Sequence, residues 1–112
     1  MRPIYHPERD QITLAGVLYA LGDPVRLEIV QLLAQKGEQA CRDCGGAIAK
    51  STLSHHFKIL REAGVIATEK SGTQHLNSLR IEDLETLFPG LLETILKSLN
   101  PQGSEVIGPK VT

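Results

Sequence analysis

Residues 50–66 read KSTLSHHFKILREAGVI, and this stretch decides the fold. Its apolar positions have the spacing of one face of an α-helix; they are Leu53, Phe57 and Leu60. The intervening side chains are mostly basic, hydroxyl or imidazole groups, so the opposite face is polar. We expect Ser51 or Thr52 to open this helix and Gly64 to end it.

The segments on either side of this helix extend the pattern. Before it, we expect a short helix over about residues 40–44 and a turn at Gly45-Gly46. After it, residues 66–70 and 73–79 flank Ser71-Gly72, where glycine accepts the positive φ of a hairpin turn. A short helix, a turn and a polar-faced helix predict a helix-turn-helix, and the hairpin would be its wing.

The outer segments are predicted to be helical. Asp10 is expected to cap a helix that ends at Gly22, with apolar positions at Leu14, Val17, Leu18 and Leu21. Asp23-Pro24 then opens a second helix, whose buried face is Val25, Ile29, Leu32 and Leu33 and which stops at Gly37. A last helix over residues 83–100 should break near Phe88 because Pro89 lies inside it. Its apolar stripe is wider than one small neighbour needs, which indicates a dimer face.

The fold class is therefore mainly α with a small β-hairpin wing (α+β), a winged helix-turn-helix. We expect an N-terminal arm over residues 1–9, one DNA-binding and dimerisation domain over 10–100, and a loose tail over 101–112. A chain of 112 residues has room for little more than one domain.

The distribution of charge fits a protein that binds a polyanion at one face. The formal net charge is −1, which excludes a histone-like polycation. Residues 41–80 nevertheless carry six basic and three acidic side chains, whereas residues 81–112 carry two and five. The positive charge therefore lies with the predicted helix-turn-helix and wing.

The polar face of the 50–66 helix suits the major groove of DNA, which admits one α-helix and offers acceptors and donors on the base edges. Lys50, Lys58 and Arg61 make this face positive, with no carboxylate between them. Lys70 and the polar hairpin tip would follow the DNA backbone. His55 points outward and is the better candidate for a DNA contact, whereas His56 is expected to be a packed, hydrogen-bonded side chain.

Two further positions also have a structural interpretation. Arg26 is expected to be an ion-pair partner within the fold rather than a phosphate clamp. Arg61 and Glu62 can equally be a solvated helix face.

Two motifs together resemble the ArsR/SmtB family of bacterial winged-helix repressors. They are ALGDPVRLEI at residues 20–29 and KSTLSHHFKILREAGVI at residues 50–66. The resemblance implies a homodimer joined through its first and last helices, which represses by binding double-stranded operator DNA and is released by an inducer. It places DNA contacts on the recognition helix and the wing tip: Lys50, Ser51, Thr52, Ser54, His55, Lys58 and Arg61, with Lys70, Ser71, Thr73 and Gln74.

The inducer is left open by the sequence. The last helix has no histidine, which argues against a histidine-carboxylate metal site there. Cys41 and Cys44 are spaced C-x-x-C, so they could oxidise or bind a thiophilic metal or metalloid, and a closed zinc site would need His6 or another residue as well. The alternative is that one or both are small buried residues. We expect no other cofactor.

Other classes of protein fit less well. A C-x-x-C thiol oxidoreductase needs a strand before its motif, and none is predicted before Cys41. A degenerate helix-turn-helix that serves only as an interaction module does not explain the intact basic face. No nucleophile, base and acid form a recognisable set, so no enzyme is predicted. The absence of a signal-peptide pattern or membrane span, with only two cysteines, predicts a cytoplasmic protein without membrane contact.

Overall fold

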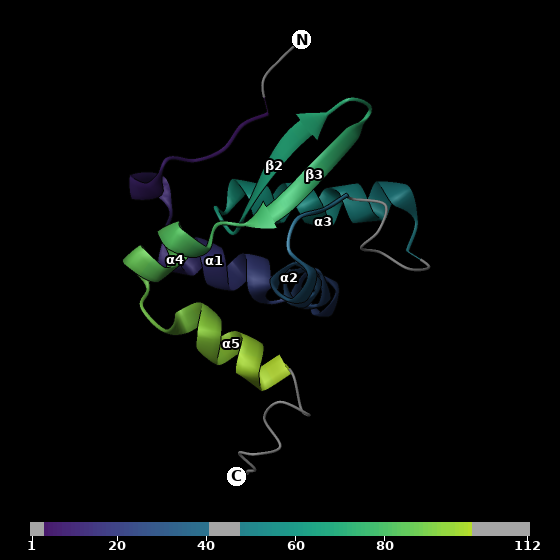
Figure 1. Cartoon of the computed structure of the whole chain (residues 1–112). Helices are drawn as coiled ribbons and strands as arrows, with labels where there is room; N and C mark the ends of the chain where they lie inside the picture. Colours follow the sequence, from purple (N-terminus) through teal and green to yellow (C-terminus); the bar gives the residue numbers. More distant parts are fainter. Residues whose placement is uncertain (1–3, 41–47, 100–112) are drawn as a thin grey trace.

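The computed structural model describes residues 4–40 and 48–99. In these ranges a short 3-10 helix η1 (Arg9–Gln11) precedes helices and strands in the following order: α1 (Leu14–Leu21), α2 (Pro24–Lys36), β1 (Gln39–Ala40), α3 (Lys50–Glu62), β2 (Ile66–Ser71), β3 (Gln74–Leu79), α4 (Ile81–Leu87) and α5 (Leu91–Leu99) (Figure 1). The predicted α+β class with a hairpin wing is confirmed.

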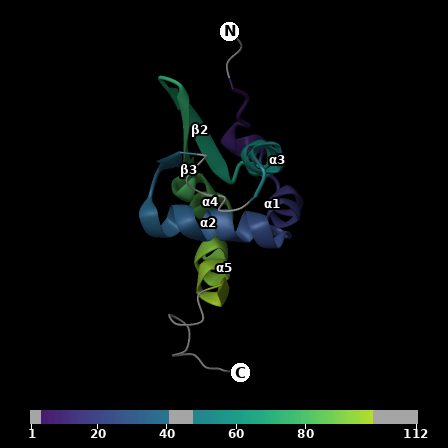
Figure 2. The same cartoon turned by 90° about the vertical axis from the view of Figure 1, so that its right-hand side faces the viewer.

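Helix α2 separates the molecule into two sides. In both views α5 lies on one side of α2, while α3 and the β2–β3 hairpin lie on the other (Figures 1 and 2). The core between them is formed by buried apolar side chains from the helices and from the start of β2: Val17, Ala20, Leu21, Ile29, Val30, Leu33, Leu53, Phe57, Leu60, Val65, Ile66, Leu84 and Leu92.

The first helix begins later than predicted. Asp10 lies in η1 and does not cap α1; the N-cap is Thr13, whose hydroxyl oxygen accepts a hydrogen bond from the amide of Gly16 at 3.0 Å. Between the two helices Ile12 is extended and inserts into the core. This extended residue interrupts the helical pattern that the sequence suggested.

The second helix begins and ends as predicted. The Asp23 carboxylate accepts hydrogen bonds from the amides of Val25 and Arg26, Pro24 is the first helical residue, and Gly37 ends the helix at φ 77°. Its buried face differs in part from the predicted one. Ile29 and Leu33 are buried as expected, but Val25 and Leu32 are half-buried, and Val30 and Arg26 are buried instead.

The sheet contains a strand that the sequence did not predict. Its order is β1-β3-β2, with both pairings antiparallel. Ala40 lies in β1 and pairs with Leu76, so the short helix predicted to begin there is wrong at Ala40; the remainder of that predicted helix lies outside the described residues. The buried Asn77 helps to hold β1, because its side-chain amide donates to the Gln39 carbonyl oxygen at 3.4 Å.

This strand bears on the oxidoreductase alternative. The expectation that no strand precedes Cys41 is wrong, since β1 ends at Ala40. Strand β1 is, however, an antiparallel edge strand, whereas the C-x-x-C oxidoreductase motif follows a strand of a parallel βαβ unit. The topology therefore still disfavours that class.

The hairpin turn lies one residue later than predicted. Ser71 pairs with Gln74, so the two loop residues are Gly72 and Thr73, and Gly72 has a φ of 63°. Positive φ at the first loop residue is typical of the tight turns that connect twisted antiparallel strands.

The C-terminal helical region is broken as predicted. Helix α4 starts at Ile81, two residues before the predicted start, and ends at Leu87, and α5 begins at Leu91. Gly90 reverses the chain between them at φ 81°.

Candidate nucleic-acid interface

Helix α3 has two chemically distinct faces. Leu53, Phe57 and Leu60 are buried, as predicted. Seven polar side chains of this helix are exposed, and we refer to the six within residues 50–58 as the reading face: Lys50, Ser51, Thr52, Ser54, His55 and Lys58. The seventh, Glu62, is the last residue of the helix. The reading face holds two lysines and no carboxylate, so it offers donors and positive charge to an approaching anion.

The start of α3 differs from the prediction. Neither Ser51 nor Thr52 is the N-cap; that position is Ala49, whose side chain has no group that could cap the helix. Helix N-terminal amides are common partners of phosphate.

The wing lies on the same side of α2 as α3 (Figures 1 and 2). At its tip Lys70, Ser71 and Thr73 are exposed and Gln74 is half-buried. The tip extends beyond the body of the molecule, away from α5 (Figures 1 and 2). One bound molecule could therefore contact both α3 and the tip.

Arg61 occupies a different environment from the reading face. Its side chain is half-buried, and among the described residues its Nε atom is buried without a hydrogen-bond partner. Arg61 therefore lies at the edge of the candidate interface rather than on its exposed centre.

His56 is packed within the fold, as expected. Its side chain is only 12% exposed, and its Nδ1 atom lies 3.2 Å from Arg26 Nη1 and 3.8 Å from Asp23 Oδ2. Arg26 is buried within the fold, as predicted for a structural residue, but the predicted ion pair is not found among the described residues: its closest partner is the Ala20 carbonyl oxygen.

The N-terminal arm is tied to the base of the wing through His6. His6 Nδ1–H donates to the Ile4 carbonyl oxygen at 3.2 Å, and Nε2 accepts from the Thr68 amide of β2 at 2.9 Å. Burial lowers the pKa of His6, and the charges of Arg61 and Arg80 lower it further, against an opposing effect of the hydrogen bond to Ile4. Because both ring nitrogens are engaged, this arrangement leaves no lone pair on His6 for a metal.

A second contact of the arm involves Arg80, which the sequence analysis did not single out. Its guanidinium donates to the Pro7 carbonyl oxygen at 2.9 Å and pairs with Asp83, which also accepts from Arg9. Hydrogen bonds from Arg9 and Arg80 lower the pKa of Asp83. No local pattern could have revealed this contact, because Pro7 and Arg80 are far apart in the sequence.

Metal-binding clusters are absent from residues 4–40 and 48–99: no three histidine, cysteine, aspartate or glutamate side chains gather there as a metal site would require. Cys41 and Cys44 lie outside the described residues. In the same ranges no helix is long and apolar enough to cross a bilayer.

The outer surface of α1 is apolar. Leu14, Leu18 and Tyr19 are 47%, 49% and 68% exposed, and we call these three residues the α1 outer surface. The apolar stripe predicted for this helix is thus divided, since Val17 and Leu21 enter the core while Leu14 and Leu18 face outward.

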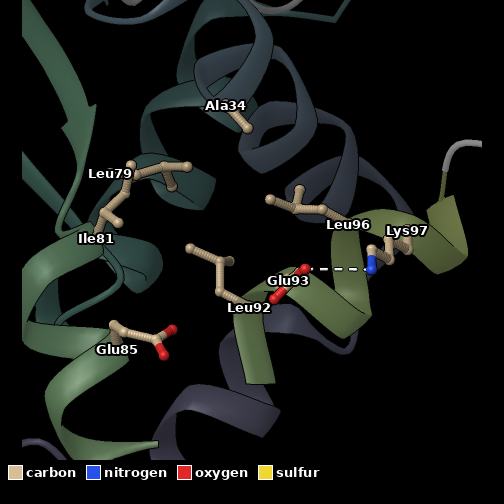
Figure 3. A pocket seen from close by; sticks show the side chains of 8 residues that line it. All are labelled: Ala34, Leu79, Ile81, Glu85, Leu92, Glu93, Leu96 and Lys97. Atoms are coloured by element: carbon tan, nitrogen blue, oxygen red, sulfur yellow. Dashed lines mark ion pairs between the residues drawn. The ribbon is translucent and has the colours of Figure 1, made fainter. Parts of the chain in front are cut away.

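On the α5 side of α2 the surface is hollowed. A cavity of about 450 Å³ lies between α2, α4 and α5, with an apolar floor and a rim that carries Glu85 and the Glu93–Lys97 ion pair (Figure 3). The apolar lining residues are Ala34, Leu79, Ile81, Leu92 and Leu96. This cavity lies on the opposite side of α2 from the reading face.

Comparison with known proteins identifies relatives with this architecture. Residues 23–68 match the family described as bacterial regulatory protein, arsR family. The HTH-type transcriptional regulator YceK of Bacillus subtilis (strain 168) is 43% identical over 89 residues, which cover 77% of this chain and 88% of YceK. The arsenical resistance operon repressor of Staphylococcus xylosus is 38% identical over 80 residues, covering 70% and 76% of the two chains.

A solved structure agrees with these relatives. The homodimeric winged helix-turn-helix DNA-binding domain of Mb0332 from Mycobacterium bovis, described as a possible ArsR-family transcriptional regulator, superimposes with a TM-score of 0.62 at 29% identity. The match covers 78% of this chain and 82% of that domain. On the strength of both the fold and these sequence relatives, the chain belongs to the ArsR family of winged helix-turn-helix transcriptional regulators.

Proposed function

We propose that the protein is a homodimeric repressor that binds a palindromic operator in double-stranded DNA and is released by an inducer. The observation that carries this proposal is the reading face of α3, where six polar side chains are exposed and two of them are lysines. Such a polar face is stable when it is exposed to water, and it can donate hydrogen bonds to base edges and phosphates.

The roles within the reading face follow from side-chain chemistry. Ser51 and Thr52 lie in the first turn of α3, where short side chains allow close approach to the groove. Ser54 and His55 offer hydrogen bonds to base edges, and Lys50 and Lys58 supply charge for phosphates. The wing residues Lys70, Ser71, Thr73 and Gln74 would follow the DNA backbone beside the groove, and Arg61 would support a phosphate contact at the edge.

A dimer explains the α1 outer surface. Leucine and tyrosine side chains exposed on one helix gain free energy when a partner covers them. The homodimeric state of the Mb0332 domain supports a second copy of this chain as that partner, with α5 contributing the other half of the interface. The two α3 helices would then enter successive major grooves about 34–36 Å apart.

For the inducer, the candidate site is the pair of thiols of Cys41 and Cys44. Thiolates bind thiophilic metals and metalloids and are also the groups that oxidants attack. The similarity to an arsenical resistance operon repressor supports a thiophilic inducer. Cys41→Ser and Cys44→Ser should then abolish release from DNA by arsenite or oxidant and leave DNA affinity unchanged; release that persists in both variants makes the thiols structural.

The proposal as a whole is tested by fluorescence anisotropy with a duplex from upstream of the protein's own gene. Lys50, Lys58 and Lys70 from each protomer give about six phosphate contacts, so the logarithm of affinity should fall with the logarithm of salt at a slope of about −5. A scrambled duplex of the same length is the control. An affinity that does not depend on salt, or equal affinity for both duplexes, contradicts sequence-specific operator binding.

A further inference from the structure

Arg26 is a buried cation at the junction of three helices. Its residue is only 7% exposed, and its Nε donates to the Ala20 carbonyl oxygen at 2.6 Å. Nη2 donates to the Tyr19 carbonyl oxygen at 3.4 Å, and the guanidinium carbon lies 5.6 Å from the centre of the Tyr19 ring. These carbonyls belong to the last turn of α1, where the helix dipole is negative, and the Tyr19 carbonyl also accepts from the Gly22 amide at 3.1 Å. Arg26 thus joins the end of α1 to α2.

The remaining nitrogen of the guanidinium reaches the helix that carries the reading face. Nη1 lies 3.2 Å from His56 Nδ1. A guanidinium can only donate, so Nδ1 of His56 is the acceptor in this contact and the ring proton is on Nε2. His56 follows His55 of the reading face directly, and their ring centres are 6.1 Å apart. A single side chain of α2 therefore contacts both α1 and α3.

Asp23 completes the surroundings of this contact. Its Oδ2 atom lies 3.8 Å from His56 Nδ1 and accepts the amides of Val25 and Arg26. Desolvation acts to raise the pKa of Asp23, but the amide hydrogen bonds and the nearby charge of Arg26 together lower the pKa below its ordinary value. Asp23 is therefore a carboxylate, and it balances the charge of Arg26.

Hydrogen bonds restrict the orientation of α3 more tightly than its apolar packing does. The contacts of Leu53, Phe57 and Leu60 with the core are non-directional and tolerate small rotations of the helix. Hydrogen bonds weaken steeply when their geometry changes, so a bonded His56 restricts the rotation of α3. Well-packed apolar groups can replace a buried charge without loss of stability. A role in orientation is therefore separable from a role in stability.

We propose that Arg26 and His56 are positioning residues that set the orientation of α3, and hence of the reading face, relative to α1. This inference rests on the proposed function, because α1 would lie in the dimer interface and α3 in the DNA. The orientation of α3 relative to α1 then determines the separation of the two reading faces in the dimer. Without the Arg26–His56 contact, the dimer should tolerate operators with altered half-site spacing.

The test uses the full-length dimer and duplexes in which the two half-sites are moved apart or together by single base pairs. His56→Leu and Arg26→Met remove the contact and keep apolar volume. Each should bind the best duplex about tenfold more weakly than the wild type and discriminate less between spacings. The double variant should be no weaker than Arg26→Met alone, because that change already removes the contact with His56.

Conservative and core variants separate positioning from stability. His56→Asn places an oxygen acceptor near the position of Nδ1 and should restore affinity and spacing preference, whereas His56→Gln places its acceptor farther out and should not. Leu33→Ala weakens the core of α2 about two turns from Arg26; it should lower Tm and keep the spacing preference. Sedimentation confirms that each variant is a dimer, and circular dichroism gives Tm.

The outcomes are distinct. Wild-type affinity and spacing preference in His56→Leu and Arg26→Met overturn this inference alone. If these two variants do not fold, equal behaviour of His56→Asn and His56→Gln overturns it, and rescue by asparagine only supports it. If the wild type binds no duplex, the proposed function fails, and this inference fails with it.

Discussion

Helices α3 and α1 both bury apolar side chains in the same core, yet their outward faces are opposite in character. The outward face of α3 is polar and positive, with Lys50, His55 and Lys58 exposed. The α1 outer surface, by contrast, exposes Leu14, Leu18 and Tyr19. A polar face is stable in water and free to meet an anion, whereas an apolar face gains free energy when protein covers it. This difference supports the two partners proposed above, DNA for α3 and a second copy of the chain for α1.

The charge of the chain follows the same division. Residues 41–80 carry an excess of three basic side chains, and residues 81–112 carry an excess of three acidic ones. Helix α5, which lies in the acidic part, is on the side of α2 away from α3 (Figures 1 and 2). The basic side chains of α3 and the wing therefore lie in a part of the chain with a positive net charge, which favours contact with phosphates.

The largest effect is expected from a charge introduced on the α1 outer surface. Leu18→Asp leaves the monomer folded, because Leu18 is 49% exposed. In a dimer the carboxylate would be buried without a partner, so dimerisation should be lost and operator affinity should fall at least about 100-fold. Sedimentation measures the oligomeric state, and fluorescence anisotropy measures the affinity.

The matched control is Gln35→Asp, which adds the same charge at an exposed position of α2. It should change neither property. A Leu18→Asp protein that remains a dimer and binds DNA like the wild type would show that the α1 outer surface is not the dimer interface.

A smaller effect on DNA affinity is expected from a substitution on α3. Lys58→Ala removes one phosphate contact from each protomer, so affinity should fall about tenfold and the salt slope should become shallower by about two. The dimer should persist, which distinguishes this variant from Leu18→Asp. Lys97→Ala, an exposed lysine on α5, is the control and should leave the slope unchanged. If the salt slope of Lys58→Ala equals that of the wild type, Lys58 makes no phosphate contact.

The wing offers a test that leaves α3 untouched. Gly72 has a φ of 63° and open space around its Cβ position, so Gly72→Ala costs only the backbone strain, about 1 kcal/mol of unfolding free energy. Chemical denaturation measures this cost, with Ser71→Ala as a strain-free neighbour. An accompanying loss of DNA affinity assigns the wing to the reading side; unchanged affinity confines DNA binding to α3.

The smallest effect concerns His6 in the arm. The pKa of His6 is lowered from its ordinary value of 6.5 by burial and by Arg61 and Arg80, so the unfolded chain binds more protons than the folded one in this range. The contribution of neutral His6 to the free energy of unfolding is therefore complete above pH 6.5, and it is lost as the pH falls through the lowered pKa of the folded state.

His6→Gln tests this by keeping an acceptor for the Thr68 amide without titrating. Its Tm should decline less than that of the wild type as the pH falls, while His6→Ala, which also loses the acceptor, should have a lower Tm at every pH. An identical pH dependence in His6→Gln and the wild type would contradict the assignment.

How far the sequence predicted the fold depended on how local each feature is. The α3 pattern was complete within residues 50–66, so its buried face was predicted correctly. Its first residue was wrong by one or two positions, because Ala49 and not a hydroxyl side chain precedes it. Strand β1 was missed because two residues carry no periodicity and its partner Asn77 lies far along the chain. The contacts of the candidate DNA interface remain predictions, although the exposure of the reading face suits them.

The sequence alone determined the buried face of α3, the first and last residues of α2, and the interruptions of the chain near Gly72 and Pro89, because these features depend on neighbouring residues and backbone sterics. Only the tertiary structure decided what each face meets. Periodicity showed that Leu14 and Leu18 are apolar, but packing left them outside the core. The Arg26–His56 contact likewise exists only because folding brings α1, α2 and α3 together, and no local pattern encodes that meeting.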